Sequence, residues 1–160
     1  MAEHRLSEPF NTPLETGLRS LAILEAAFPE HLDLQRLVEL DYLVVHSADI
    51  GGPESLHAPL PLRAGELLVR RELIERGLAL MMSKGLIVRQ VSPDGLEYAA
   101  GEAASAYLAS LSAPYTLSLR ERAAWLIENF QGFSTEELRG LIRRFFSHWS
   151  SEFEPAKGTR

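Results

Sequence analysis

Cysteine is absent from the 160 residues. Its absence excludes a disulfide framework and any zinc site built on thiolates, and it is typical of a protein that works in a reducing compartment. The longest apolar run is Leu78–Met82, whereas a membrane-spanning helix needs about 20 apolar residues. Charged residues also interrupt the first ten positions, where a secretory signal would be apolar. We therefore predict a soluble, cytoplasmic protein.

Signatures of catalysis are missing as well. The sequence contains no His-Glu-x-x-His, no Gly-x-Ser-x-Gly and no phosphate-binding glycine-rich loop. The polar residues His46, Ser47, Asp49 and His57 do not have the spacing of a triad or a metal site. These absences predict a protein that is not an enzyme and that uses neither a metal nor a cofactor. A small hydrolase acting through His46 and His57 stays open as a third class of function.

Basic residues are scarce in the N-terminal part of the chain. The net charge is -6, and residues 1–62 hold ten acidic side chains against three basic ones. An acidic protein can bind DNA through a local patch, but its overall field does not attract phosphate. Any contact with DNA would therefore depend on a local basic surface.

The residues that are present predict mostly helices. Thr12–Glu15 has the pattern of a capping box with proline at the first helical position, and Pro29 ends the apolar periodicity that follows. Asp33–His46 predicts a second helix that is apolar almost all round and therefore buried. Prolines and glycines in Ser47–Arg63 predict a long loop, which at this length is often functional.

A helix, a hairpin and further helices are expected next. Ala64–Lys84 has helical periodicity, and Gly85 is suited to cap its end. Leu86–Val91 and Leu96–Ala99 predict two strands joined by a turn at Ser92–Gly95.

The C-terminal part of the chain predicts three more helices. The first is Ala103–Leu111, after which Pro114 is expected to break the chain. Capping boxes are expected to open the two final helices, at Ser118 with Glu121 and at Ser134 with Glu137.

This order predicts a mainly α winged helix-turn-helix fold, with a two-stranded β-hairpin as the wing and additional C-terminal helices. Residues 1–112 would form the winged helix-turn-helix domain, which includes the long loop 47–63. Residues 113–160 would form a C-terminal helical extension. Because winged domains also serve as protein-docking modules, this fold does not decide the function.

The segment Ala64–Lys84 would be the helix that enters the major groove if the domain read DNA. Its basic residues have acidic residues at the spacing of intrahelical ion pairs, Glu66 with Arg70 and Glu72 with Arg76. The hairpin adds one basic residue and two acidic ones. The sequence therefore argues against a basic reading face, and the candidates for DNA contact in that alternative are Arg70, Arg76, Lys84 and Arg89.

Several residues are candidates for contact with another protein. Arg71 lies on the apolar stripe of its helix, where it either extends past the stripe or pairs with Glu75, or else binds a carboxylate of a partner. Trp125 lies opposite the buried stripe of its helix, as an anchor for a partner or packed against the wing helix or the long loop. The last helix carries a wide apolar arc that closes the core or faces a partner. Its aromatic candidates are Phe145, Phe146, Trp149 and Phe153.

Four segments carry a resemblance to a known family. They are Pro9–Arg19 (PFNTPLETGLR), Leu40–Ser47 (LDYLVVHS), the Gly51–His57 loop and, above all, Arg63–Met82 (RAGELLVRRELIERGLALMM). The chain resembles the middle component of bacterial ABC-three-component conflict systems, which include the Lamassu-type anti-phage systems. The resemblance spans roughly residues 9 to 130 and rests on a diffuse pattern without a catalytic signature.

The resemblance implies a small, non-catalytic winged-helix subunit that works with an SMC- or Rad50-like ABC ATPase and an effector, often a nuclease. It carries over no catalytic residue. We therefore expect an adaptor that contacts DNA, if at all, through the complex. The alternative is a dimeric winged-helix transcription regulator, which shares the order of helices and wing.

Overall fold

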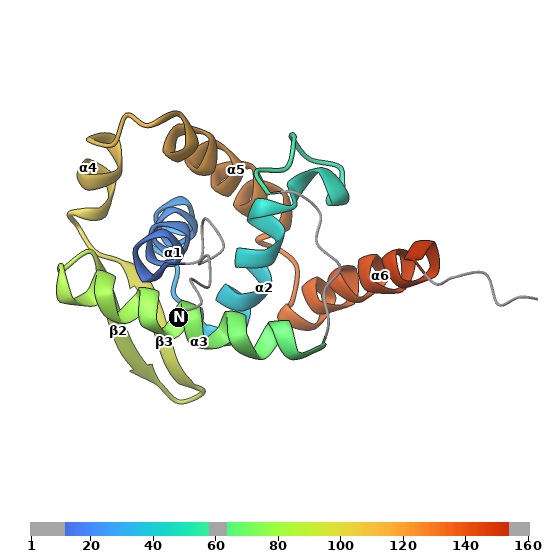
Figure 1. Ribbon diagram of the computed structural model, residues 1–160. Helices are drawn as coiled ribbons and strands as arrows, with labels where there is room; N and C mark the ends of the chain where they lie inside the picture. Colours follow the sequence, from blue (N-terminus) through green and yellow to red (C-terminus); the bar gives the residue numbers. More distant parts are fainter. Residues whose placement is uncertain (1–11, 58–63, 154–160) are drawn as a thin grey trace, which may run out of the picture.

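The computed structural model describes residues 12–57 and 64–153, with side chains described for residues 12–57 and 69–144 (Figure 1). Within these ranges the chain is mainly α-helical, with one short 3-10 helix, η1, and one small sheet. The elements in chain order are α1 (Pro13–Ala27), β1 (Leu32–Asp33), α2 (Leu34–Val45), η1 (Ser47–Ile50), α3 (Ala64–Ser83), β2 (Ile87–Ser92), β3 (Gly95–Ala100), α4 (Ala104–Ala109), α5 (Pro114–Phe130) and α6 (Thr135–Phe153).

The sheet has three strands, and the expectation of two was incomplete. All neighbours are antiparallel in the order β1-β3-β2, and Leu32 and Asp33 of β1 pair with Tyr98 and Glu97 of β3. A strand of two residues is too short to leave an alternating pattern in the sequence. The resulting order, helix, strand, helix, helix and hairpin, is that of a winged-helix-like, mainly α fold.

The predicted start signals of the first two helices are confirmed. The Thr12 side chain accepts a hydrogen bond from the Glu15 amide, and the Glu15 carboxylate accepts one from the Thr12 amide. Asp33 caps α2 through the Arg36 amide at 2.7 Å. At the end of α3, Gly85 has the positive φ of 70° expected of a glycine cap.

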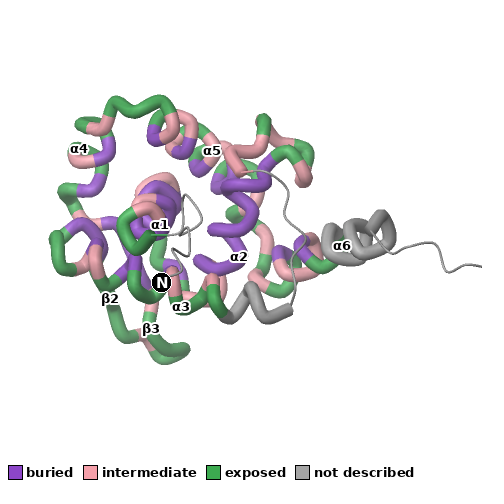
Figure 2. Tube along the Cα trace, viewed as in Figure 1, coloured by how far each residue is buried: buried purple, intermediate pink, exposed green. Residues whose placement is uncertain are grey.

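The core forms around α1 and α2. In Figure 1, α1 lies at the centre with α2, α3, α4 and α5 around it, and α1 packs against each of these helices. Figure 2 shows α2 buried along most of its length, as its apolar sequence predicted. Leu126 of α5 and Leu138 of α6 are also fully buried in this core.

The closest crossing joins α1 to α3 through two glycines. A Cβ on Gly77 would lie 2.6 Å from the Gly17 nitrogen, and a Cβ on Gly17 would lie 2.8 Å from the Gly77 oxygen. No side chain fits between backbones at that separation. These two glycines therefore fix how deeply α3 lies against the core.

The predicted start of the penultimate helix was wrong. Pro114 occupies the first turn of α5 after Ala113, and Ser118 lies inside the helix. Proline is well tolerated there because its missing N–H would have no partner inside the helix. The start of α6 was predicted correctly, since the Ser134 hydroxyl accepts the Glu137 amide at 3.0 Å.

Candidate interaction surfaces

The helix expected to read DNA uses one of its arginines inside the protein. Arg70 of α3 donates through Nη1 to Oδ2 of Asp41 on α2 at 2.5 Å, and Arg19 of α1 donates through Nε to Oδ1 at 2.8 Å. Asp41 is fully buried, Arg19 is 2% exposed and Arg70 is 18% exposed. We call these three residues the Arg19–Asp41–Arg70 network, which joins α1, α2 and α3.

The electrostatics of this network keep its ions charged. Burial alone would raise the pKa of Asp41, but the guanidinium groups of Arg19 and Arg70 outweigh burial and lower it. Burial likewise opposes the charge of Arg19, and Asp41 outweighs it so that the pKa of Arg19 is raised. Arg70 also lies over the ring of Tyr42, with its guanidinium carbon 5.6 Å from the centroid. Each charge is therefore compensated within the protein.

Sequence reasoning missed this network and paired Arg70 with Glu66, whose side chain lies outside the described residues. A signal was present, because Arg19 and Asp41 each interrupt an otherwise apolar helix face. The other predicted pair is wrong, since Glu72 and Arg76 are both exposed and form no ion pair within the described part of the chain. The outer face of α3 carries Glu72, Glu75, Arg76 and Ser83, all exposed and mixed in charge.

The described part of the long loop packs against α2 and α5. The amides of Leu56 and His57 both donate to the Val45 carbonyl at 3.1 Å. His57 Nε2 lies 2.9 Å from the Tyr115 hydroxyl of α5, and Arg122 Nε donates to the Glu54 carbonyl at 3.1 Å. The 3-10 helix η1 begins this segment, where the composition had predicted no helical turn.

The two histidines considered for a hydrolase come together, with His46 buried and His57 half-buried. His46 is 5% exposed, and its ring centroid lies 6.4 Å from that of His57. Burial, reinforced by Arg70, lowers the pKa of His46 to about 4. Burial, reinforced by Arg19, lowers the pKa of His57 to about 4 as well. Both imidazoles are therefore neutral at pH 7 and belong to the packing between the loop and α5.

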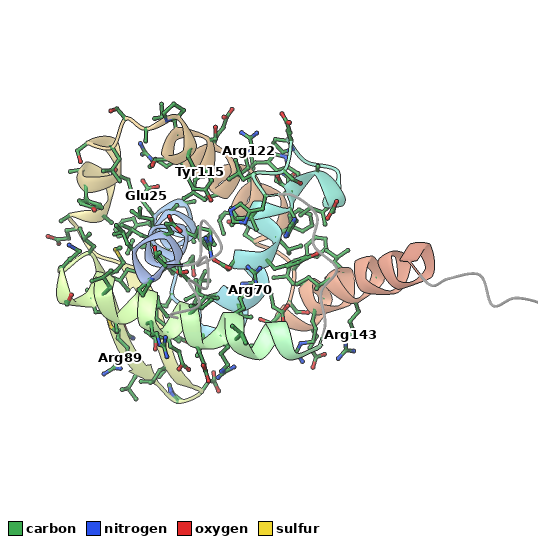
Figure 3. All side chains as sticks on the ribbon, viewed as in Figure 1. Glu25, Arg70, Arg89, Tyr115, Arg122 and Arg143 are labelled. Atoms are coloured by element: carbon green, nitrogen blue, oxygen red, sulfur yellow. The ribbon has the colours of Figure 1, made fainter. Side chains whose placement is uncertain are left out.

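The wing presents apolar side chains to solvent. Val88 and Val91 of β2 are 47% and 78% exposed, and Leu96 of β3 is 44% exposed. Arg89 extends away from the body of the domain (Figure 3). A wing that binds DNA would present more cations than this one. Its surface is better suited to protein contact.

A family model matches residues 9–152, and it describes the ABC-three component (ABC-3C) system Middle Component 2. The chain belongs to this family. No curated protein and no solved structure matches it. The resemblance at residues 9–130 is therefore confirmed and extended into α6, and the family places the chain within a system of several components.

In this middle component, Arg71 is 44% exposed and has local partners. Its Nη1 donates to the Gln35 side-chain oxygen at 3.1 Å, and its Nε lies 3.8 Å from a Glu75 carboxylate oxygen. Pairing with Glu75 was one of the three alternatives for this residue. Contact of Arg71 with a partner stays a prediction.

Trp125 lies between α5 and the long loop. A Cβ on Gly52 would lie 2.4 Å from the indole, and the ring of Phe130 lies 5.7 Å away between centroids. Packing against the loop was one of the two alternatives for this residue. An additional contact of Trp125 with a partner stays a prediction.

The last helix packs on α2 through its first half. Leu138 and Ile142 are buried, and Arg139 Nε lies 3.2 Å from a carboxylate oxygen of the buried Glu39. The backbone of α6 continues to Phe153 and projects from the body of the domain (Figure 1). The predicted interface side chains of Phe145, Phe146, Trp149 and Phe153 lie outside the described residues.

Among the helices of the described ranges, none has the length and apolar character needed to cross a bilayer. The same ranges contain no group of three histidine, aspartate or glutamate side chains placed to hold a metal ion.

Proposed function

We propose that this middle component is a non-catalytic, cytoplasmic adaptor that joins an SMC- or Rad50-like ABC ATPase to a nuclease-type effector in a Lamassu-like anti-phage complex. The observation that carries the proposal is the hydrogen bond of Arg70 to Asp41 inside the protein. The helix that a DNA-binding winged domain would insert into the groove directs this cation inward to Asp41. What remains on its outer face is mixed in charge and does not match a phosphate backbone.

Two other features support docking to proteins. Apolar side chains are exposed on the wing, at Val88, Val91 and Leu96, and exposed apolar groups of this kind favour protein contact. The histidines that a hydrolase would need are neutral at pH 7; His46 is buried, and the half-buried His57 is hydrogen-bonded to Tyr115.

Reconstitution of the three components tests the proposal. The tagged ATPase is purified after co-expression with the effector, with and without the middle component. We expect the effector to co-purify with the ATPase only when the middle component is present. Equal recovery of the effector in its absence would rule out the linking role, and turnover of a substrate by the middle component alone would rule out the non-catalytic one.

The exposed cations Arg76, Lys84 and Arg89 favour a second candidate function, that of a dimeric transcription regulator. A salt titration of duplex binding separates the two. A regulator binds its operator at nanomolar concentrations with a steep salt dependence, whereas an adaptor alone binds duplex weakly.

A further inference from the structure

The strand β2 forms an open edge of the sheet. In the order β1-β3-β2 it has β3 on one side and no strand on the other among the described residues. Six consecutive residues pair with β3 without a bulge, and none of them is proline. Natural edge strands are usually shortened, bulged, covered, charged or interrupted by proline, because an open edge binds other strands. Ile87 is 2% exposed and therefore covered, whereas from Val88 to Ser92 the charge of Arg89 is the one such protection.

The register identifies the backbone groups that face outward. The Gly101 amide donates to the Leu86 carbonyl at 2.9 Å, which makes Leu86 and Gly101 a hydrogen-bonded pair. Such pairs alternate along an antiparallel ladder, so Val88, Gln90 and Ser92 direct their backbone groups to β3. Ile87, Arg89 and Val91 therefore direct their N–H and C=O groups away from β3, and of these three residues Ile87 is buried while Arg89 and Val91 are exposed. A strand added there would meet Arg89 and Val91 in the register of a regular ladder.

The side chains at this edge define what such a strand should carry. Arg89 and Val91 lie on one face of the sheet because side chains two residues apart share a face. Arg89 is exposed, and Val91 is 78% exposed and pairs with the exposed Leu96. An added strand with an acidic residue opposite Arg89 and an apolar residue opposite Val91 would complement both.

Charge disfavours DNA and a second copy of the chain as occupants of this edge. The hairpin from Ile87 to Ala100 has one basic side chain, Arg89, and two acidic ones, Asp94 and Glu97, so a DNA backbone would not be attracted to it. A second copy would pair through β2 itself, which carries Arg89 and no acidic residue. It would therefore bring another guanidinium group to the edge and no carboxylate to pair with Arg89.

We infer that β2 receives an extended segment of a partner component as a fourth strand, and that this segment carries an acidic and an apolar residue two positions apart. The inference rests on the proposed adaptor function and assigns one of its docking surfaces. Main-chain hydrogen bonds to Arg89 and Val91 provide the affinity, and the two side chains provide the specificity.

Amide hydrogen exchange on the full chain, alone and assembled with the ATPase and effector, tests this inference. In the isolated chain we expect fast exchange at Arg89 and Val91 and slow exchange at Val88 and Gln90. Assembly should slow exchange at Arg89 and Val91 by about tenfold or more, since each new hydrogen bond and the burial around it stabilise the closed amide.

Two substitutions probe the same edge. Val91→Pro removes an outward N–H but no hydrogen bond to β3, and it should weaken assembly by about tenfold. Arg89→Glu should weaken assembly through charge, whereas the control Gln90→Ala should leave assembly and exchange unchanged. Circular dichroism confirms that each variant is folded, and the exchange measurement on the unmodified chain does not depend on the variants.

The outcomes are distinct. A complex that forms while Arg89 and Val91 still exchange rapidly overturns the strand addition and leaves the adaptor function standing. Failure of any complex to form overturns the adaptor function itself. Protection that appears in the isolated chain as its concentration rises, or only on adding duplex DNA, assigns the edge to a second copy or to DNA and also overturns the inference.

Discussion

Arg70 and Asp41 are 29 positions apart in the chain and form a hydrogen-bonded ion pair across α3 and α2. Arg19 completes the charge balance from α1, so one buried carboxylate holds three helices. Arg70 was a candidate for DNA contact on the helix that a winged domain inserts into the major groove. Here its guanidinium group is bound to Asp41 inside the protein instead. The outer surface of the middle component is left to mixed charge and exposed apolar groups.

The network should be essential for stability. Asp41→Asn leaves two guanidinium groups without their counter-ion, one of them fully buried, and should lower the free energy of unfolding by about 3–5 kcal/mol. Arg71→Ala removes a neighbouring but exposed cation and should cost less than about 1 kcal/mol. Urea unfolding followed by tryptophan fluorescence measures both. Equal costs for the two variants would show that the network contributes no more than a surface pair.

Stability should fall when the pH drops below neutrality. Burial lowers the pKa of His46 and of His57 from 6.5 to about 4. As the pH falls, the unfolded chain therefore binds protons at these histidines before the folded chain does. The contribution of these groups is complete above pH 6.5 and is lost as the pH falls from 6.5 towards 4. Urea unfolding at pH 7.5 and pH 5 measures the loss. His46→Gln should reduce the loss of stability between pH 7.5 and pH 5, whereas the control His31→Gln should leave that loss unchanged. A loss in His46→Gln equal to that of the wild type would show that His46 does not contribute to it.

The glycine crossing should not tolerate a methyl group. Gly77→Ala places a Cβ 2.6 Å from the backbone nitrogen of Gly17, and should destabilise the fold by about 1–3 kcal/mol through overpacking. Gly140→Ala is the matched control, because no atom lies within 4 Å of its added Cβ in α6. It should stabilise by about 0.5–1 kcal/mol through helix propensity. Thermal melts compare the two, and a shift of the same sign in both would refute the close packing.

Trp125 should hold the long loop in place. Trp125→Ala removes the surface on which Gly52 lies, so amide exchange within residues 47–57 should become faster while α1 remains protected. Leu117→Ala, on the same helix but 52% exposed, is the control and should leave the loop unchanged. If Trp125→Ala abolishes co-purification with the other components without altering loop exchange, the tryptophan acts as a partner anchor.

Substitution of Arg71 tests partner binding without a large effect on stability. Arg71→Glu reverses an exposed charge whose contacts are Gln35 and Glu75, so the fold should lose less than about 1 kcal/mol. If Arg71 binds a carboxylate of the ATPase or effector, co-purification should fall by about tenfold or more. Arg143→Glu, an exposed charge on α6, is the control. Wild-type assembly of Arg71→Glu would remove this residue from the interface.

Local signals predicted much of the fold. Thr12, Asp33 and Ser134 each act within three residues, which is why the starts of three helices could be predicted from neighbours in the chain. Pro114 shows the limit of such signals, because proline ends one helix and begins another with equal ease. Thr116 and Leu119, in the first two turns of α5, are buried in a helix that packs on α1 and α2, and neighbours in the chain carry no information about this packing.

The sequence by itself determined the helical character of the chain and the position of the hairpin, because capping, periodicity and turn chemistry act over a few residues. It also determined membership of the ABC-3C middle components, through a match that spans residues 9–152. The tertiary structure decided that Arg70 bonds to Asp41, that Leu32 and Asp33 add a third strand, and that Trp125 packs on Gly52. These relationships join residues from 29 to 73 positions apart. Their partners are selected by helix packing, and spacing along the chain carries no information about them.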